Sequence, residues 1–399
     1  MGRERNAEQD LERRDTDMNW RNEAVFVSGA TGFIGGRVCE RMMQAGVSKV
    51  RALVHGMHRA ARIARMPVQL CPGDLLQRET LRQALGEAKV VVHCGLGPAS
   101  DIARGTENML AVAHDAGVKR FVHVSTAAIY GITPAPGSEL EDAPVRRTGD
   151  PYCDNKAATE KVVLHYGKRG LPVTILRPSI VWGPYSAWST RLMDDLREGR
   201  VAFIEGGRGA CNATYVDNLI DAIVLSLEND LALNEAFFIT DGQRLSWGDF
   251  IRAHIALMDP APEIGEISRA EIAASRNGSS GILLGSIKAA TRVARSKEFR
   301  QMLMQIPLSE AAMKRAWIWV ESLPPQKRER LRARFGVRGA STKSVKAQFV
   351  PDEVTEATQS SNVFFSIEKA RRILGYEPRV GFAEGMKRVE QWLRYAAYL

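Results

Sequence analysis

Tyr152 and Lys156 are separated by three residues, a spacing that can support acid–base chemistry. In a helix, this spacing places both side chains on one face, one turn apart. A free tyrosine has a pKa of about 10, so its hydroxyl is a poor base at neutral pH. A cation one turn away stabilises the phenolate and lowers that pKa. The pair could therefore move a proton to or from an alcohol oxygen.

Two hydroxyl side chains, Ser125 and Thr126, follow the apolar run Phe121-Val122-His123-Val124. A hydroxyl at the end of such a strand can hold a substrate oxygen against Tyr152. The alternative role for a hydroxyl at this place is to cap a turn or a helix. The presence of Tyr152 and Lys156 downstream favours the catalytic role.

Three glycines, Gly29, Gly32 and Gly35, lie between the apolar run Val25–Val27 and a helical pattern from Arg37 to Gln44. A strand, a glycine turn and a helix in this order are typical of a dinucleotide site. The glycines permit a tight turn, a close approach of the pyrophosphate and close packing of helix on strand. The free N–H groups of the helix start would bind the phosphates. We expect cofactor contacts from Gly29, Thr31, Gly32, Phe33, Ile34 and Gly35.

Strands and helices alternate from residue 24 to about residue 185, which predicts an α/β fold with a doubly wound parallel sheet. The expected strands after the first are 50–54, 68–70, 90–93, 121–124 and 173–176, and the expected helices between them are 79–85, 105–116 and 155–168.

The glycine spacing and the Tyr-x-x-x-Lys motif together resemble the extended branch of the short-chain dehydrogenase/reductase family. The resemblance implies a Rossmann-type domain and a catalytic Thr126, because the family's hydroxyl lies four residues before the Tyr130-Gly131 pair. It also implies that Lys156 bonds the nicotinamide ribose and that Asp74 caps the adenine. The other cofactor residues that it implies are Leu75, Cys94, Gly95, Ser125, Tyr152, Pro178 and Ile180.

The end of the second expected strand bears on the choice of cofactor. His55 stands there, Arg59 and Arg62 follow, and no acid occurs between Val50 and Arg65. Bases at this place suit the 2′-phosphate of NADP, whereas an acid would suit the ribose of NAD. We expect NADP rather than NAD, with a solvated basic helix face as the alternative. The five scattered cysteines indicate no metal site and a reduced, cytoplasmic protein.

The resemblance also narrows the reaction. Dehydratases of the family follow the catalytic Thr with an Asp-Glu pair, where this chain has Ala127 and Ala128. Nucleotide-sugar enzymes carry an Asn and an Arg where this chain has Ile180 and Cys211. We therefore expect an NAD(P)-dependent oxidoreductase that transfers a hydride at a secondary alcohol or ketone, similar to 3β-hydroxysteroid dehydrogenases. A nucleotide-sugar epimerase and a non-catalytic cofactor-binding scaffold stay open as alternatives.

The chain of 399 residues is long for one domain. We expect a disordered tail (1–22), a Rossmann domain (23–185), a substrate lobe (186–260 and 361–399) and a basic helical insertion (261–360). Residues 281–340 carry thirteen bases and four acids, which matches the net charge of +9 of the whole chain.

The basic segment leaves two alternatives open. It also carries Trp317 and Trp319, and a basic amphipathic stretch with aromatic residues can lie on an anionic membrane surface. The alternative that we favour is a helical cap over the substrate cleft. We expect a small-molecule hydroxyl or keto substrate and no nucleic-acid partner; a homodimer and contact with the inner membrane through 281–340 stay open. No apolar window long enough to span a membrane occurs in the sequence.

Overall fold

The computed structural model describes residues 19–95, 97, 99–278 and 349–399. The chain forms two compact units, one of residues 1–266 and 351–399 and one of residues 267–350. In the second unit, the structure describes the helix α9 (Arg269–Gly278), whose start is capped by reciprocal hydrogen bonds between Ser268 and Glu271. All other elements below belong to the first unit.

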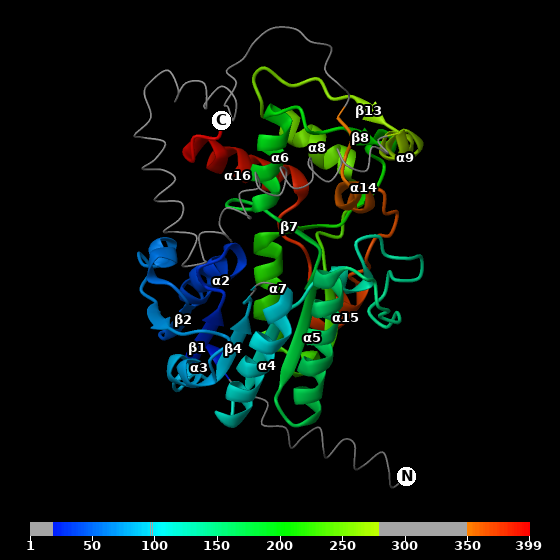
Figure 1. The fold of residues 1–399 in the computed structure, drawn as a ribbon. Helices are drawn as coiled ribbons and strands as arrows, with labels where there is room; N and C mark the ends of the chain where they lie inside the picture. The colour runs from blue at the N-terminus through cyan, green and yellow to red at the C-terminus, as the bar shows by residue number, and fades with distance from the viewer. Residues whose placement is uncertain (1–18, 96, 98, 279–348) are drawn as a thin grey trace, which may run out of the picture. The chain divides into compact units, whose positions relative to one another are not determined.

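A seven-stranded parallel sheet forms the centre of the first unit (Figure 1). Its strands lie in the order β11-β6-β5-β4-β1-β2-β3, and every neighbouring pair runs in the same direction. The strands are β1 (Val25–Ser28), β2 (Val50–Val54), β3 (Gln69–Pro72), β4 (Val90–His93), β5 (Arg120–Val124), β6 (Val173–Pro178) and β11 (Ala236–Ile239). The expectation of a doubly wound parallel sheet is confirmed.

Helices cover both faces of this sheet, and side chains alternate between two cores along each strand. Phe26, Val91 and Phe121 pack with residues of the helices on one face, while Val25, Val27 and Val92 pack on the other. The first face is covered by α3 (Arg78–Leu85), α4 (Ala99–Asp115) and α5 (Pro151–Lys168), and the second by α2 (Phe33–Gln44) and α7 (Val216–Glu228). Figure 1 shows α4 and α5 side by side, as parallel strands with helical crossovers require.

A smaller set of elements extends from the carboxyl side of the sheet. Two short strand pairs occur there: β7 (Ile180–Trp182) with β10 (Ala213–Tyr215), and β9 (Ala210–Cys211) with β12 (Leu245–Ser246). The helices there are α6 (Ala187–Arg197), α8 (Trp247–Ile255), α14 (Glu353–Gln359) and α16 (Phe382–Tyr395), whereas α15 (Glu368–Leu374) packs beside β11 and α7.

Four expected boundaries were wrong. Residues 20–22 do not belong to a disordered tail, because they form a 3₁₀ turn in which Trp20 is buried in the core. Residues 236–239 are the seventh strand of the central sheet rather than part of the substrate lobe, because they pair with β6. The helix expected from Asn155 starts at Pro151, where Asp150 caps it and a proline fits the first turn. The helix expected from Gly105 starts at Ala99.

The expected insertion is described only at its two ends. Residues 351–360 fall in the first compact unit, so the expected end of the insertion at residue 360 was too late. The basic segment 281–340 lies outside the described residues, and its role stays a prediction. Among the described residues, no helix is long and apolar enough to cross a membrane.

One buried carboxylate, Asp241, ties the end of β11 to the smaller elements. It accepts hydrogen bonds from the Trp182 indole (3.0 Å), the Tyr215 backbone (2.7 Å) and the Asn218 amide (2.8 Å). Asn218 in turn accepts bonds from the backbone of Arg379 and Val380 (both 3.0 Å). Burial raises the pKa of Asp241 to about 6, although the three donated hydrogen bonds lower it. The folded protein therefore contains a carboxylate that is costly to ionise.

Replacing Asp241 by Asn should change the pH dependence of stability in a defined direction. Between pH 3.8 and about 6 the folded wild type binds more protons than the unfolded chain, so its free energy of unfolding falls as pH rises. Relative to Asp241→Asn, the wild type should lose about 2 kcal/mol across this range, with a limiting slope of about 1.4 kcal/mol for each pH unit. Urea unfolding of both proteins between pH 4 and pH 7 measures this. Parallel curves would contradict the assignment.

Candidate active site

Three groups of predicted site residues follow neighbouring strands at their carboxyl ends. Gly29 follows β1, Cys94 follows β4 and Ser125 follows β5, and these strands are adjacent in the order β5-β4-β1. The strand order reverses between β4 and β1, because the chain fills one half of the sheet before the other. Parallel α/β sheets bind ligands at such a switch point, outside the carboxyl ends of the strands. The topology thus brings the glycine turn and the Ser125-Thr126 pair to one edge.

The glycine turn is packed so tightly that side chains would collide with backbone. Gly29 has a φ of +69°, and a Cβ atom there would lie 2.5 Å from the Cys94 carbonyl oxygen. A Cβ at Gly35 would overlap the Gly29 carbonyl group. At Gly95 a Cβ would instead meet side-chain atoms, 2.7 Å from a Leu75 methyl group. Gly29 thus lets the turn lie against the loop after β4, and Gly35 lets the start of α2 pack against the turn.

The start of α2 is suited to a pyrophosphate. Gly32 is the residue that precedes the helix, it is exposed, and no side chain caps the N–H groups there among the described residues. Phe33 and Ile34 form the first helical positions and are half-buried. Free N–H groups and the positive end of the helix dipole bind phosphate. Thr31 lies half-buried within the turn, so the turn fits the dinucleotide that its sequence predicts.

The ends of β2 and β3 place His55 near Asp74. The His55 Nδ1 atom lies 4.0 Å from the Asp74 carboxylate, and His55 is largely exposed. Asp74 also accepts a hydrogen bond from the Leu76 backbone (2.9 Å). Arg59 is exposed, whereas Arg62 pairs with Glu40 (3.1 Å) and lies over the Tyr185 ring. His55 and Arg59 are therefore accessible to a ligand, and Arg62 is engaged elsewhere.

Thr126 lies at the turn on which α5, the helix of Tyr152, packs. It caps the turn Ala127–Tyr130, with its Oγ1 accepting from the Ala128 backbone (3.1 Å). The capping role and a place near Tyr152 coexist. Burial raises the pKa of Tyr152, and the influence of the Thr126 side chain only partly offsets this. The expected lowering of this pKa was wrong for the protein as described.

The position of Lys156 explains why the pKa of Tyr152 is not lowered. Lys156 is 2% exposed, and its ammonium group donates to the Val124 carbonyl oxygen (3.2 Å). Burial lowers the pKa of Lys156 to about 8. The ammonium group is thus engaged by the end of β5, and the influences on the pKa of Tyr152 come from burial, Thr126, Cys153 and Asp150.

The remaining predicted residues lie on the sheet and beside it. The Ser125 backbone N–H donates to Leu176 (2.7 Å), and its hydroxyl is buried without a partner among the described residues. Pro178 is buried at the end of β6, opposite Ile239. Ile180 is half-buried in β7 and donates its backbone N–H to Asn212 (3.1 Å). No group of three or more His, Cys, Asp or Glu side chains that could hold a metal occurs in the described part of the chain.

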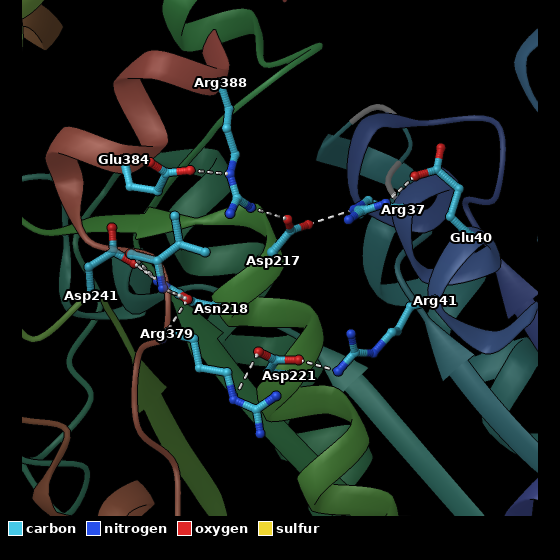
Figure 2. Close-up of polar contacts among 11 residues, drawn as sticks. Arg37, Glu40, Arg41, Asp217, Asn218, Asp221, Asp241, Arg379, Glu384 and Arg388 are labelled. Atoms are coloured by element: carbon cyan, nitrogen blue, oxygen red, sulfur yellow. Dashed lines mark hydrogen bonds and ion pairs between the residues drawn. The ribbon is translucent and has the colours of Figure 1, made fainter. Parts of the chain in front are cut away.

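A ladder of ion pairs, which the sequence reading missed, fixes α2 against α7 and the C-terminal segment (Figure 2). Asp217 lies between Arg37 (2.5 Å) and Arg388 (3.4 Å), and Asp221 pairs with Arg41 (2.5 Å). Asp221 also faces Arg379 (3.9 Å). The sequence contained a pattern that could have predicted these ion pairs, because Arg37 and Arg41 are one helical turn apart, as are Asp217 and Asp221. Ion pairs with α7 therefore help to fix the position of α2, the helix that starts at the glycine turn.

Comparison with protein families identifies the class of the protein. Residues 25–239 match the NAD dependent epimerase/dehydratase family. The chain belongs to this family, the extended short-chain dehydrogenases/reductases, and it is an enzyme of the oxidoreductase type found there.

Individual relatives are similar over most of their length. A ketoreductase of Stigmatella aurantiaca, which acts on 4-hydroxy-2-methyl-3-oxo-4-farnesyl-3,4-dihydroquinoline-1-oxide, is 30% identical over 258 residues, 61% of this chain and 75% of the relative. A 3-beta-hydroxysteroid dehydrogenase of Mycolicibacterium neoaurum is 25% identical over 57% of this chain and 68% of the relative. The structure of a UDP-glucose 4-epimerase from Thermotoga maritima superposes with a TM-score of 0.63 at 17% identity, over 94% of this chain and 99% of that one. This last likeness shows the fold.

Gly32→Val should abolish cofactor binding while leaving the fold intact. The backbone at Gly32 has a φ of −86°, which other residues adopt, and its Cβ would lie 3.2 Å from the Gly29 carbonyl oxygen. A branched side chain would instead occupy the space needed by the pyrophosphate. Fluorescence titration with NADPH and NADH measures the effect.

Gly35→Ala serves as the comparison, because its Cβ would overlap backbone and should lower the melting temperature as well. Unchanged affinity of Gly32→Val for both cofactors would contradict the assignment of residues 29–35.

Proposed function

We propose that this enzyme transfers a hydride between a nicotinamide cofactor and a secondary alcohol or ketone of a mainly apolar substrate. The observation that carries the proposal is the packing of α5, which bears Tyr152 and Lys156, on the turn that Thr126 caps, at the sheet edge that also bears the glycine turn. The relatives named for a farnesylated ring ketone and for a 3β-hydroxysteroid support an apolar substrate.

Each of the three side chains has a distinct task in this proposal. Thr126 orients the substrate oxygen, and Tyr152 donates a proton to that oxygen or accepts one from it. Lys156, buried and held by Val124, keeps a positive charge one helical turn from Tyr152 and would bind the nicotinamide ribose. When bound, the cofactor supplies or accepts the hydride at the carbon that bears the oxygen. The glycine turn, Asp74, Leu75, Cys94 and Gly95 would hold the rest of the cofactor.

Two positions favour the alcohol or ketone over a nucleotide sugar. Ile180 and Cys211 stand where nucleotide-sugar enzymes of the family carry side chains that reach the diphosphate. Cys211 is fully buried in β9 and packs in the core, so this position offers no charge to a ligand. Binding a diphosphate without paired donors would be costly.

We further propose NADP as the preferred cofactor. Support comes from the exposed His55 and Arg59 at the end of β2 and from the absence of an acid between residues 50 and 65. An acid at this place would favour the free ribose hydroxyls of NAD. Tighter binding of NADH than of NADPH would contradict this preference.

A small substrate panel tests the function. A 3β-hydroxysteroid with the oxidised cofactor and the farnesylated 3-oxo-dihydroquinoline with the reduced cofactor should change the nicotinamide absorbance in proportion to product. UDP-glucose should give no product. Conversion of UDP-glucose to UDP-galactose without a net absorbance change would instead establish an epimerase.

Tyr152→Phe should remove most turnover while leaving the fold and cofactor affinity nearly unchanged. Only the hydroxyl that transfers the proton is lost, and general acid–base groups contribute about 10²- to 10⁴-fold in rate. Initial rates with the active panel compound measure the loss. Tyr166→Phe is a matched control, because Tyr166 lies on the same helix and packs against His114 and His165, away from Thr126. A wild-type rate for Tyr152→Phe would refute the catalytic assignment.

A further inference from the structure

A buried ion pair lies behind the proposed catalytic residues. The Arg177 Nε donates to both carboxylate oxygens of Glu160 (3.1 Å each), and its Nη2 donates to Oε2 (2.7 Å). The two side chains are 7% and 5% exposed. Such a forked contact fixes the orientation of both groups as well as their separation. Arg177 belongs to β6 and Glu160 to α5, so the pair sets how α5 is rotated against the sheet.

The other side of the same guanidinium holds a second element. The Arg177 Nη1 donates to the Tyr130 hydroxyl and to the Glu141 carbonyl oxygen (3.1 Å each). The Tyr130 hydroxyl donates to that carbonyl as well (3.0 Å), and the Glu141 carboxylate accepts from the Phe238 backbone (2.8 Å). Tyr130 ends the turn that Thr126 begins. The loop from that turn to Tyr152 is therefore anchored at its middle.

These contacts connect the two halves of the proposed catalytic group. Tyr152, Lys156 and Glu160 are spaced by four residues on α5 and share one face of the helix. We propose that Arg177 and Glu160 are positioning residues that align Tyr152 and Lys156 of α5 with Thr126. This inference rests on the proposed function, because it concerns the geometry of the same site.

A purely structural role predicts a different outcome. A buried ion pair is weak evidence for stability, since two apolar residues of similar size often stabilise a fold equally well. Apolar residues cannot fix a rotation by directed hydrogen bonds. A double variant, Glu160→Met with Arg177→Met, therefore separates the two roles, because it avoids an unpaired buried charge and loses the fork.

The experiment compares four proteins with the wild type: Glu160→Gln, Arg177→Lys, the double methionine variant and Asp230→Asn. The last is the control. Asp230 pairs with Arg120 at the opposite end of β5 from Ser125, so its loss affects the same sheet away from the site. Melting temperature, kcat and KM for the active panel compound are measured for each protein.

We expect kcat to fall on the order of 100-fold in Glu160→Gln and Arg177→Lys with a much smaller change in KM, as for a misplacement of about 1 Å. Asp230→Asn should lower the melting temperature without this loss. The double variant should stay slow even where its melting temperature recovers. Recovery of kcat together with stability would overturn the proposal, as would losses no larger than in the control. If the double variant does not recover stability, the loss of kcat in Arg177→Lys is compared with that in Asp230→Asn. An equal loss in the two variants would then overturn the proposal.

Electrostatics needs its own control. Lys156 is faced by His93 and Cys94 from the β4 side, by His123 from β5 and by Glu160 from its own helix. Glu160 raises the pKa of Lys156, so Glu160→Gln lowers it further. A loss caused only by deprotonation of Lys156 would disappear at about pH 6. Misalignment predicts a loss of kcat that persists there, and full recovery would contradict the proposal.

A substrate-free measurement separates this inference from the proposed function. The Thr126 side chain lowers the pKa of Tyr152, so misalignment of α5 against Thr126 should raise that pKa. The pKa of Tyr152 is measured in each variant by ultraviolet difference titration, with the same variant carrying Tyr152→Phe as the reference. An unchanged pKa of Tyr152 in Glu160→Gln and Arg177→Lys would overturn the positioning role, whether or not the wild type turns over a panel compound. A wild type that turns over no panel compound would refute the proposed function instead.

Discussion

The proposed active site depends on the order and direction of seven strands. Because all strands run in parallel, the residues that follow β1, β4, β5 and β6 are delivered to one edge, and the reversal between β4 and β1 opens that edge to a ligand. The glycine turn then needs no side chain of its own, since the free backbone groups of α2 and the loop at Cys94 form its walls. The proposed dinucleotide site is thus a property of the backbone, whereas the chemistry proposed for Thr126, Tyr152 and Lys156 is carried by side chains.

The charged contacts around this edge hold helices that the sheet alone does not fix. On one face, Asp217 and Asp221 of α7 hold Arg37 and Arg41 of α2, which begins at the glycine turn. On the other, Glu160 of α5 is held by Arg177 of β6. The first set is half-exposed and is screened by solvent, so its contribution to stability is small. The second is buried, and its value lies in the geometry that it imposes.

Periodicity and motif spacing predicted the sheet and six of its seven strands, because buried parallel strands read as apolar runs between helices. The seventh strand, at 236–239, was missed since its pairing with β6 spans some sixty residues of intervening chain. The motif residues could be placed by the order of the strands. The pKa of Tyr152 could not, because it depends on burial and on where the Lys156 ammonium group points. The contacts of Arg177 with Glu160 and Tyr130 needed coordinates, because they join residues far apart in the chain.

Isotope transfer tests the central claim, direct hydride transfer to a carbonyl carbon, most directly. The enzyme is given the ketone from the panel and reduced cofactor that carries deuterium at the transferred position of the nicotinamide, and the product alcohol is analysed by mass spectrometry. The account predicts one deuterium in each alcohol formed, on the carbon that bears the hydroxyl, with Tyr152→Phe forming little product. Alcohol that lacks the deuterium while the cofactor retains it would contradict the account.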